Sequence, residues 1–262
     1  MELIDTSYLR PCLLHRQDES HKGDYGHLLV VAGCQTMPGA AVLPTGAALR
    51  SGCGLVTLHS TARALQAVVD RDPSAMLSED PGDAFSRLPE PMDRYSAVAV
   101  GPGLGRSAET KEALLKLLRS VDERRIPAVI DADALNLLSE IPKWKGFVPR
   151  GAVLTPHLGE LRRLFYGDTD GLDHQVRDLC TEAGFTLVMK GFHTKVFTPD
   201  GTCLVNTTGN PGLAKGGSGD VLTGLVGGLL ARGYDAPSAA ALGVWIHGFA
   251  GDVLTRERTA EA

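Results

Sequence analysis

The chain is 262 residues long and carries a formal net charge of −5, with a sequence pI of about 5.9. This acidic balance argues against nonspecific binding to nucleic acid or to an anionic membrane surface. Hydrophobic residues at 43%, aromatic residues at only 5% and 31 glycines favour a compact, turn-rich α/β enzyme over a disordered chain.

Short apolar runs alternate with helical patterns along most of the chain. In chain order, we predict a strand at residues 28–32, a helix at 39–50, strands at 55–58 and 97–100, a helix at 108–118, and strands at 128–130, 153–154 and 187–189. Two further strands, near residues 195–198 and 202–206, form a predicted hairpin across the Pro-Asp-Gly sequence at 199–201. Helices follow at residues 220–231 and at about 237–254. Residues 70–93 contain five prolines or glycines and are predicted to form a long irregular connection.

Strands that alternate with helices predict βαβ crossovers and a mostly parallel sheet with helices on both faces. The sequence contains no repeat, low-complexity tract or convincing linker, so we predict a single α/β domain over residues 1–262. Residues 1–17 lack the apolar core of a signal peptide, and no apolar run is as long as a membrane span. The five cysteines are scattered without metal-like spacing, which favours free thiols in a reducing cytoplasm.

A glycine-rich segment at residues 210–219 runs into an apolar helix, with Asp220 at the junction. Glycine lets backbone N–H groups approach an anion closely, and the start of a helix adds partial positive charge. We therefore predict a phosphate-binding loop in which Asp220 deprotonates a hydroxyl beside a transferred phosphoryl group. The segment is not a Walker A loop, because Gly-Lys-Ser/Thr is missing at the required spacing. The alternative is a tight turn in which Asp220 only caps the helix.

Asp131 and Asp133 directly follow the predicted strand at residues 128–130. Two carboxylates beside a phosphate site are suited to holding Mg²⁺ through its waters, because this hard ion prefers oxygen ligands. The alternative makes Asp133 the cap of the following helix, with Asn136 facing the ligand as a neutral donor.

Three further motifs follow predicted strands: Gly-Pro-Gly-Leu-Gly at 101–105, Thr-Pro-His at 155–157 and Lys-Gly-Phe-His-Thr at 190–194. The first is either a backbone cradle for phosphate or ribose oxygens or an ordinary tight turn. His157 either lines the substrate pocket or lies on the surface near a helix start. Lys190 suits nucleotide phosphates, with a solvated lysine as the alternative. Ligands of open α/β sheets bind at the carboxyl ends of the strands, where all these motifs lie.

Together these segments resemble the ADP- or ATP-dependent NAD(P)H-hydrate dehydratases of the ribokinase-like superfamily. The matching pieces are His-Lys-Gly-Asp-Tyr-Gly at 21–26, Met-Pro-Gly-Ala-Ala at 37–41, the motifs at 101–105, 131–135 and 155–157, Lys-Gly with a later Thr at 190–194, and Gly-Gly-Ser-Gly-Asp at 216–220. Seven segments in the same order cover nearly the whole chain. The last one also fits related vitamin kinases, whereas the first two indicate the dehydratase branch.

The resemblance implies repair of NADH and NADPH that carry a water at C6 of the nicotinamide ring (NADHX and NADPHX). ADP, or ATP in eukaryotic members, would be the co-substrate, and Mg²⁺ the cofactor. By resemblance, Asp220 is catalytic, and the substrate contacts are Ala41, Gly105, His157 and Asp220. The residues expected to hold the nucleotide are Lys190, Gly191, Phe192, His193, Thr194, Gly216, Gly217, Ser218 and Gly219, with Asn136 and Asp131 as further candidates. We also expect a homo-oligomer (tetramer or dimer) and a separate epimerase, because the dehydratase motifs begin too early to leave room for that domain.

Converting the C6 hydroxyl into a phosphate makes it a good leaving group, so Asp220 is expected to guide this hydroxyl to the terminal phosphoryl group. A helix start favours the anionic form of Asp220, which predicts a weak base whose value lies in its position. Lys215 and Ser218 depart from the usual loop of the family, and the sequence does not show how Lys215 affects nucleotide choice. Two other functions remain open: a kinase of a vitamin precursor alcohol, and a catalytically silent nucleotide-binding module.

Overall fold

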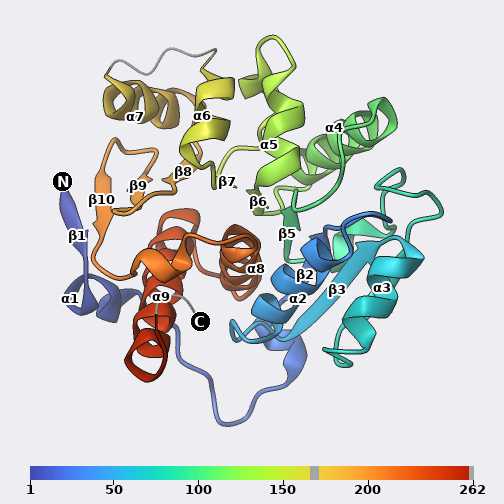
Figure 1. Cartoon of the computed structure of the whole chain (residues 1–262), viewed down its shortest axis with the longest axis horizontal. Coiled ribbons are helices and arrows are strands. Elements are labelled where there is room, and N and C mark those ends of the chain that lie inside the picture. Colours follow the sequence, from blue (N-terminus) through green and yellow to red (C-terminus); the bar gives the residue numbers. More distant parts are fainter. Residues whose placement is uncertain (166–170, 260–262) are drawn as a thin grey trace.

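The computed structural model describes residues 1–165 and 171–259. Its strands form one continuous sheet in the order β1-β10-β9-β8-β7-β6-β5-β2-β3-β4 (Figure 1). The strands are β1 (Glu2–Ile4), β2 (His27–Val31), β3 (Leu55–Ser60), β4 (Met76–Glu79), β5 (Ala97–Val100), β6 (Ala128–Ile130), β7 (Val153–Leu154), β8 (Thr186–Met189), β9 (Lys195–Phe197) and β10 (Cys203–Asn206). The predicted mostly parallel α/β sheet is thereby confirmed.

All neighbours from β8 to β4 in this order pair in parallel, and only β9 runs antiparallel to its partners. The predicted hairpin between β9 and β10 is present. The irregular connection predicted at residues 70–93 is wrong in part, because β4 lies inside it and pairs with β3. This strand is mostly exposed at the sheet edge, so its sequence carries no buried apolar run. The short edge strand β1 was missed for the same reason.

The helices are α1 (Thr6–Leu9), α2 (Gly39–Leu49), α3 (Ala62–Val69), α4 (Ala108–Glu123), α5 (Ala132–Ser139), α6 (Leu158–Leu164), α7 (Leu172–Ala183), α8 (Ser218–Ala231) and α9 (Ala236–Glu257). Short 3₁₀ turns are η1 (Arg10–Cys12), η2 (Lys22–Tyr25), η3 (Met92–Arg94), η4 (Trp144–Phe147) and η5 (Pro211–Leu213). The predicted helices correspond to α2, α4, α8 and α9. Within the described residues, no helix has the length and apolar character needed to cross a bilayer.

The sheet separates two apolar cores, because successive strand residues point to opposite faces. Leu29 and Val31 of β2 join a core that α4, α5, α6 and α7 cover. Leu28 and Val30 join the other core, which includes α2, α3, α8 and α9. Figure 1 shows α4 to α7 along the upper side of the sheet and α1, α9, α8 and α2 along its lower side. Both faces are therefore buried, as a parallel sheet requires.

Helix α8 packs so closely against α2 that a side chain larger than hydrogen would not fit at the contact. A Cβ atom at Gly224 would lie 2.0 Å from the carbonyl oxygen of Pro44, and one at Gly217 would lie 2.4 Å from Cδ1 of Leu43. These obstacles include backbone, which cannot move aside as the end of a flexible side chain can. The close packing fixes where α8 begins relative to the sheet.

We expect Gly224→Ala to destabilise the fold by about 3 kcal/mol, because the new methyl group overlaps the α2 backbone. Urea unfolding measures the loss. Gly146→Ala is the matched control, since a Cβ there meets no atom within 4 Å. Equal stability of the two variants would contradict the packing argument.

Candidate functional site

Polar residues from three neighbouring strands meet at one edge of the sheet. Asp131 directly follows β6, Lys190 directly follows β8, and His157 is the third residue after β7. His157 and Lys190 also form an isolated parallel bridge. Because β6, β7 and β8 are parallel, their carboxyl ends share this edge. The predicted gathering of motifs at the strand ends is confirmed for these three residues.

Asp131 is the centre of a buried polar network. Its side chain is 1% exposed, and its Oδ1 accepts a hydrogen bond from Nζ of Lys190 at 2.8 Å. Its Oδ2 accepts from the Thr223 hydroxyl at 2.6 Å. The network therefore ties β6 and β8 to α8. A Cβ at Gly219 would lie 3.2 Å from the same Lys190 nitrogen, so the small residue makes room for the ammonium group.

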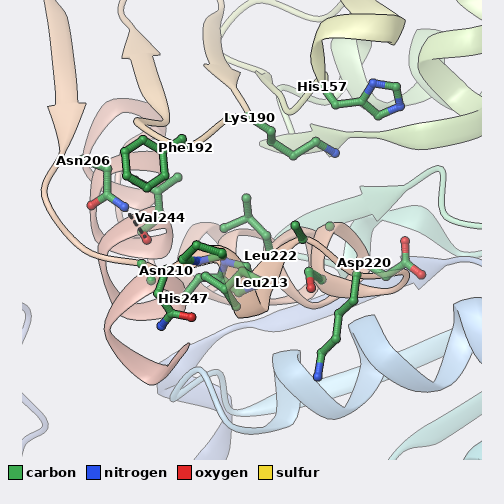
Figure 2. Close-up of a pocket in the computed structure, with 18 of the residues that line it drawn as sticks. His157, Lys190, Phe192, Asn206, Asn210, Leu213, Asp220, Leu222, Val244 and His247 are labelled. Atoms are coloured by element: carbon green, nitrogen blue, oxygen red, sulfur yellow. Dashed lines mark hydrogen bonds between the residues drawn. The ribbon is translucent and has the colours of Figure 1, made fainter. Parts of the chain in front are cut away.

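A cavity of about 790 Å³ opens between this edge and the start of α8. Figure 2 shows Lys190 reaching into the space between His157 and Asp220, while Phe192, Asn206 and Val244 lie toward the other end. The lining thus has a charged end and a more apolar end. Predicted nucleotide residues in the lining are Lys190, Gly191, Phe192, Gly216, Ser218 and Gly219. A cavity of this size and mixed lining suits a small phosphorylated ligand with an aromatic base.

Three predicted nucleotide residues do not line the cavity. Gly217 has a φ of 90° and packs against Leu43 of α2, so it supports the loop on the side away from the cavity. The Thr194 hydroxyl donates to the carbonyl oxygen of Gly191 at 3.1 Å and supports the turn. His193 lies edge-on to Phe192, with ring centroids 4.4 Å apart.

Asp220 lines the cavity from the first turn of α8 and does not cap the helix. The N-cap position belongs to Gly217, so the capping alternative is wrong. Burial and, to a smaller extent, the Asp131 carboxylate together raise the pKa of Asp220 to about 6, against the opposing effect of the Lys190 ammonium. The expectation of a weakly basic, readily ionised carboxylate is therefore wrong. Desolvation and a neighbouring negative charge outweigh the partial positive charge of the helix start.

His157 lines the cavity and also caps α6, so it lies at a helix start as one interpretation predicted, and its contact with a substrate stays a prediction. Its Nδ1 accepts from the backbone N–H groups of Gly159 at 2.9 Å and Glu160 at 3.3 Å. With Nδ1 acting as an acceptor, the neutral ring carries its proton on Nε2, and the hydrogen-bond pattern assigns this tautomer. The exposed ring is thus a fixed hydrogen-bond donor at the rim of the site.

Two predicted substrate contacts lie outside the cavity. Ala41 is fully buried, and a Cβ on Gly33 would come within 2.8 Å of its methyl group. It has no surface with which to touch a ligand, so its direct contact with the substrate is not supported. Gly105 is partly exposed and donates its N–H to Oδ2 of Asp133 at 3.0 Å.

The carboxylates near the edge do not fit a protein-made magnesium site. Asp131 uses both oxygens on Lys190 and Thr223, and Asp133 accepts from the Gly105 backbone. Across residues 1–165 and 171–259, no three His, Cys, Asp or Glu side chains are arranged to hold a metal ion. Asp133 is not a helix cap either, because Asp131 occupies that position before α5. The predicted pairing of Asp131 and Asp133 around Mg²⁺ is therefore not supported.

Two ionisable residues of the cavity, Glu160 and His247, were missed. Glu160 is 5% exposed and lies 3.9 Å from Nζ of Lys190; burial raises its pKa. Its position three residues after His157 is a capping-box signal, which could have placed it at the site. His247 lies on α9, and burial lowers its pKa. The sequence around His247 is that of an apolar helix, and it does not indicate that this histidine lies near the start of α8.

A family model described as NAD(P)H-hydrate dehydratase matches residues 28–262. An ADP-dependent (S)-NAD(P)H-hydrate dehydratase of Neisseria meningitidis is 38% identical over 91% of this chain and 80% of that protein. A bifunctional NAD(P)H-hydrate repair enzyme of Moorella thermoacetica is 37% identical over 98% of this chain, which spans about half the length of that relative.

A crystal structure of the Bacillus subtilis ADP/ATP-dependent NAD(P)H-hydrate dehydratase, co-crystallised with ATP and Mg²⁺, has a TM-score of 0.84 and 32% identity. The match covers 100% of this chain and 92% of that one. A ribokinase-like superfamily protein of Enterococcus faecalis has a TM-score of 0.82 and 27% identity over 97% of this chain and 88% of that one, and the two likenesses confirm the predicted ribokinase-like fold.

We expect Asp220→Asn to stabilise the fold at pH 8 by on the order of 2 kcal/mol. Ionising Asp220 costs free energy only in the folded chain, where its pKa is about 6 rather than 3.8. Wild-type stability should therefore fall as the pH rises from about 4 to about 6, and an amide removes this cost. The advantage should vanish by about pH 3, below both pKa values, where the carboxyl is mostly protonated in both states. Urea unfolding at the two pH values measures it, and an equal gain at both would contradict the assigned pKa.

Proposed function

Because the chain belongs to the NAD(P)H-hydrate dehydratase family, we propose that it is an ADP-dependent (6S)-NAD(P)H-hydrate dehydratase. It would convert NADHX or NADPHX and ADP into NAD(P)H, AMP and phosphate. The observation that carries the proposal is Asp220, a carboxyl with a raised pKa at the start of α8, in a cavity that also holds the Lys190 ammonium. Such a pair suits proton removal beside a phosphoryl group.

In the first proposed step, the C6 hydroxyl oxygen attacks the terminal phosphorus of ADP, and the bond from phosphorus to the AMP oxygen breaks. Asp220 accepts the hydroxyl proton. In the second step, the ring nitrogen lone pair expels phosphate from C6, and loss of a proton from C5 restores the ring double bond. The protein would contribute chiefly to the first step, because phosphate is already a good leaving group.

Lys190 and the backbone amides of the glycine loop are placed to stabilise charge on the nucleotide phosphates. Gly216, Ser218 and Gly219 line the cavity beside Asp220, with α8 starting at Ser218. The apolar surface of Phe192 and Val244 at the other end suits the adenine ring. We propose these residues as the nucleotide site, with Gly217, His193 and Thr194 supporting the loops that carry them.

Magnesium would neutralise phosphate charge when bound. The carboxylates of Asp131 and Asp133 are already engaged, so the nucleotide phosphates and water would supply most of its ligands. A single domain, a tetrameric or dimeric assembly, a cytoplasmic location and a separate epimerase remain predictions from the sequence.

The proposal is tested by following restoration of reduced-nicotinamide absorbance from NADHX and from NADPHX. ADP and ATP are compared side by side, and AMP and phosphate are measured as products. We expect recovery that depends on the nucleotide, with ADP preferred. Recovery with neither nucleotide, or a stable phosphorylated product of a vitamin precursor alcohol, would reject the proposal and favour a kinase.

The pH dependence of kcat/KM should show an acid limb with an apparent pKa of about 6, because Asp220 accepts a proton only when it is ionised. Activity should therefore rise as the pH increases through this value. Asp220→Asn should lower kcat by a factor on the order of a hundred and remove the limb. Steady-state kinetics between pH 5 and 8 check both effects. A variant with near-normal turnover would exclude Asp220 as the base.

A further inference from the structure

The cavity accounts for one ligand, whereas the proposed reaction brings two together. Gly105, a predicted dinucleotide contact, does not line the cavity. It follows β5, on the side of β6 away from β7 and β8. The second ligand therefore has the carboxyl end of β5 and the rim beside His157 available to it, and Asp220 lines the adjoining cavity.

A continuous hydrogen-bonded track crosses these strand ends. The N–H of Gly105 donates to Oδ2 of Asp133 at 3.0 Å. Nδ2 of Asn136 donates to Oδ1 of Asp133 at 3.4 Å. Nε of Arg163 donates to Oδ1 of Asn136 at 3.0 Å. Asn136 thus connects α5 with the guanidinium of α6; its amide nitrogen donates to Asp133 and it does not line the cavity, so its predicted role as a ligand-facing donor is not supported.

The Arg163 guanidinium also lies close to His157. A Cβ built on Gly159 would be 3.9 Å from Nη1 of Arg163 and 2.8 Å from Cε1 of His157. The track therefore begins at Gly105, a predicted substrate contact, and ends at an exposed positive charge near His157, another predicted substrate contact. Nε is engaged by Asn136, which orients the guanidinium plane.

Three cations near the track already have a carboxylate partner. Lys190 pairs with Asp131, and Arg106 and Lys111 both pair with Glu140. Among the residues that the structure describes, no carboxylate lies within ion-pair distance of Arg163. A dinucleotide carries a pyrophosphate, and NADPHX carries an additional 2′-phosphate. Arginine presents a planar set of donors that matches phosphate oxygens.

We propose that Arg163 binds a phosphate group of the hydrated dinucleotide and sets the affinity for that substrate. The inference rests on the proposed function, because it takes a nicotinamide dinucleotide as the second ligand. Asp133 and Asn136 act as positioning residues that hold the guanidinium beside the sheet edge.

The test compares Arg163→Gln with Arg162→Gln. Both arginines are exposed and lie in the last turn of α6, and only Arg163 contacts Asn136 among the described residues. Arg163→Gln should raise KM for NADPHX about tenfold and leave KM for ADP within twofold, because one charge-assisted hydrogen bond to phosphate is lost. Arg162→Gln should stay within twofold of wild type for both. Thermal unfolding confirms that both variants fold.

The two phosphate sources are separated by the second substrate. Equal losses with NADHX and NADPHX assign the pyrophosphate, and a loss confined to NADPHX assigns the 2′-phosphate. Binding of intact NADH and NADPH can be monitored by nicotinamide fluorescence, which gives a readout that does not require turnover. This binding should weaken in Arg163→Gln. If the wild type repairs no hydrate, the proposed function fails, and the fluorescence titration still tests Arg163. Affinities of Arg163→Gln within twofold of Arg162→Gln for both dinucleotides would overturn the inference.

Discussion

The site depends on the buried contacts of Asp131. Its two carboxylate oxygens bind Lys190, 59 residues away in sequence, and Thr223, 92 residues away. Removing either partner would leave a buried polar group unsatisfied, which is costly in a protein interior. These contacts hold Lys190, which follows β8, and the first turns of α8 at the end of β6. The close packing of α8 on α2 fixes the same helix from its other side.

The same arrangement explains why Asp220 is unusual. The Asp131 carboxylate and burial both disfavour its ionised form, and the Lys190 ammonium only partly compensates, because Asp131 already engages it. A carboxyl with a pKa of about 6 is a better base near neutral pH than an ordinary aspartate. Ionising Asp220 in this environment lowers the stability of the fold, a cost that functional sites commonly carry.

The sequence predicted most of the sheet, because buried parallel strands are continuous apolar runs. It missed β4 and β1, where short edge strands carry no such signal. Motif positions at strand ends correctly brought Asp131, His157 and Lys190 together, since topology alone determines that edge. The ionisation of Asp220 could not be predicted, because it depends on burial and on a carboxylate 89 residues earlier in the chain. His247 was missed for a similar reason: α9 brings it to α8 only through tertiary packing.

Burial and the Asp131 carboxylate together raise the pKa of Asp220, and carboxyl NMR of ¹³C-labelled aspartate tests the contribution of Asp131 most directly. A pH titration of the wild-type protein should give Asp220 a pKa of about 6. In Asp131→Asn, which keeps a hydrogen-bonding side chain and removes the charge, the pKa should move toward the ordinary aspartate value of 3.8. A wild-type value already near 3.8, or an identical titration in the variant, would contradict the account.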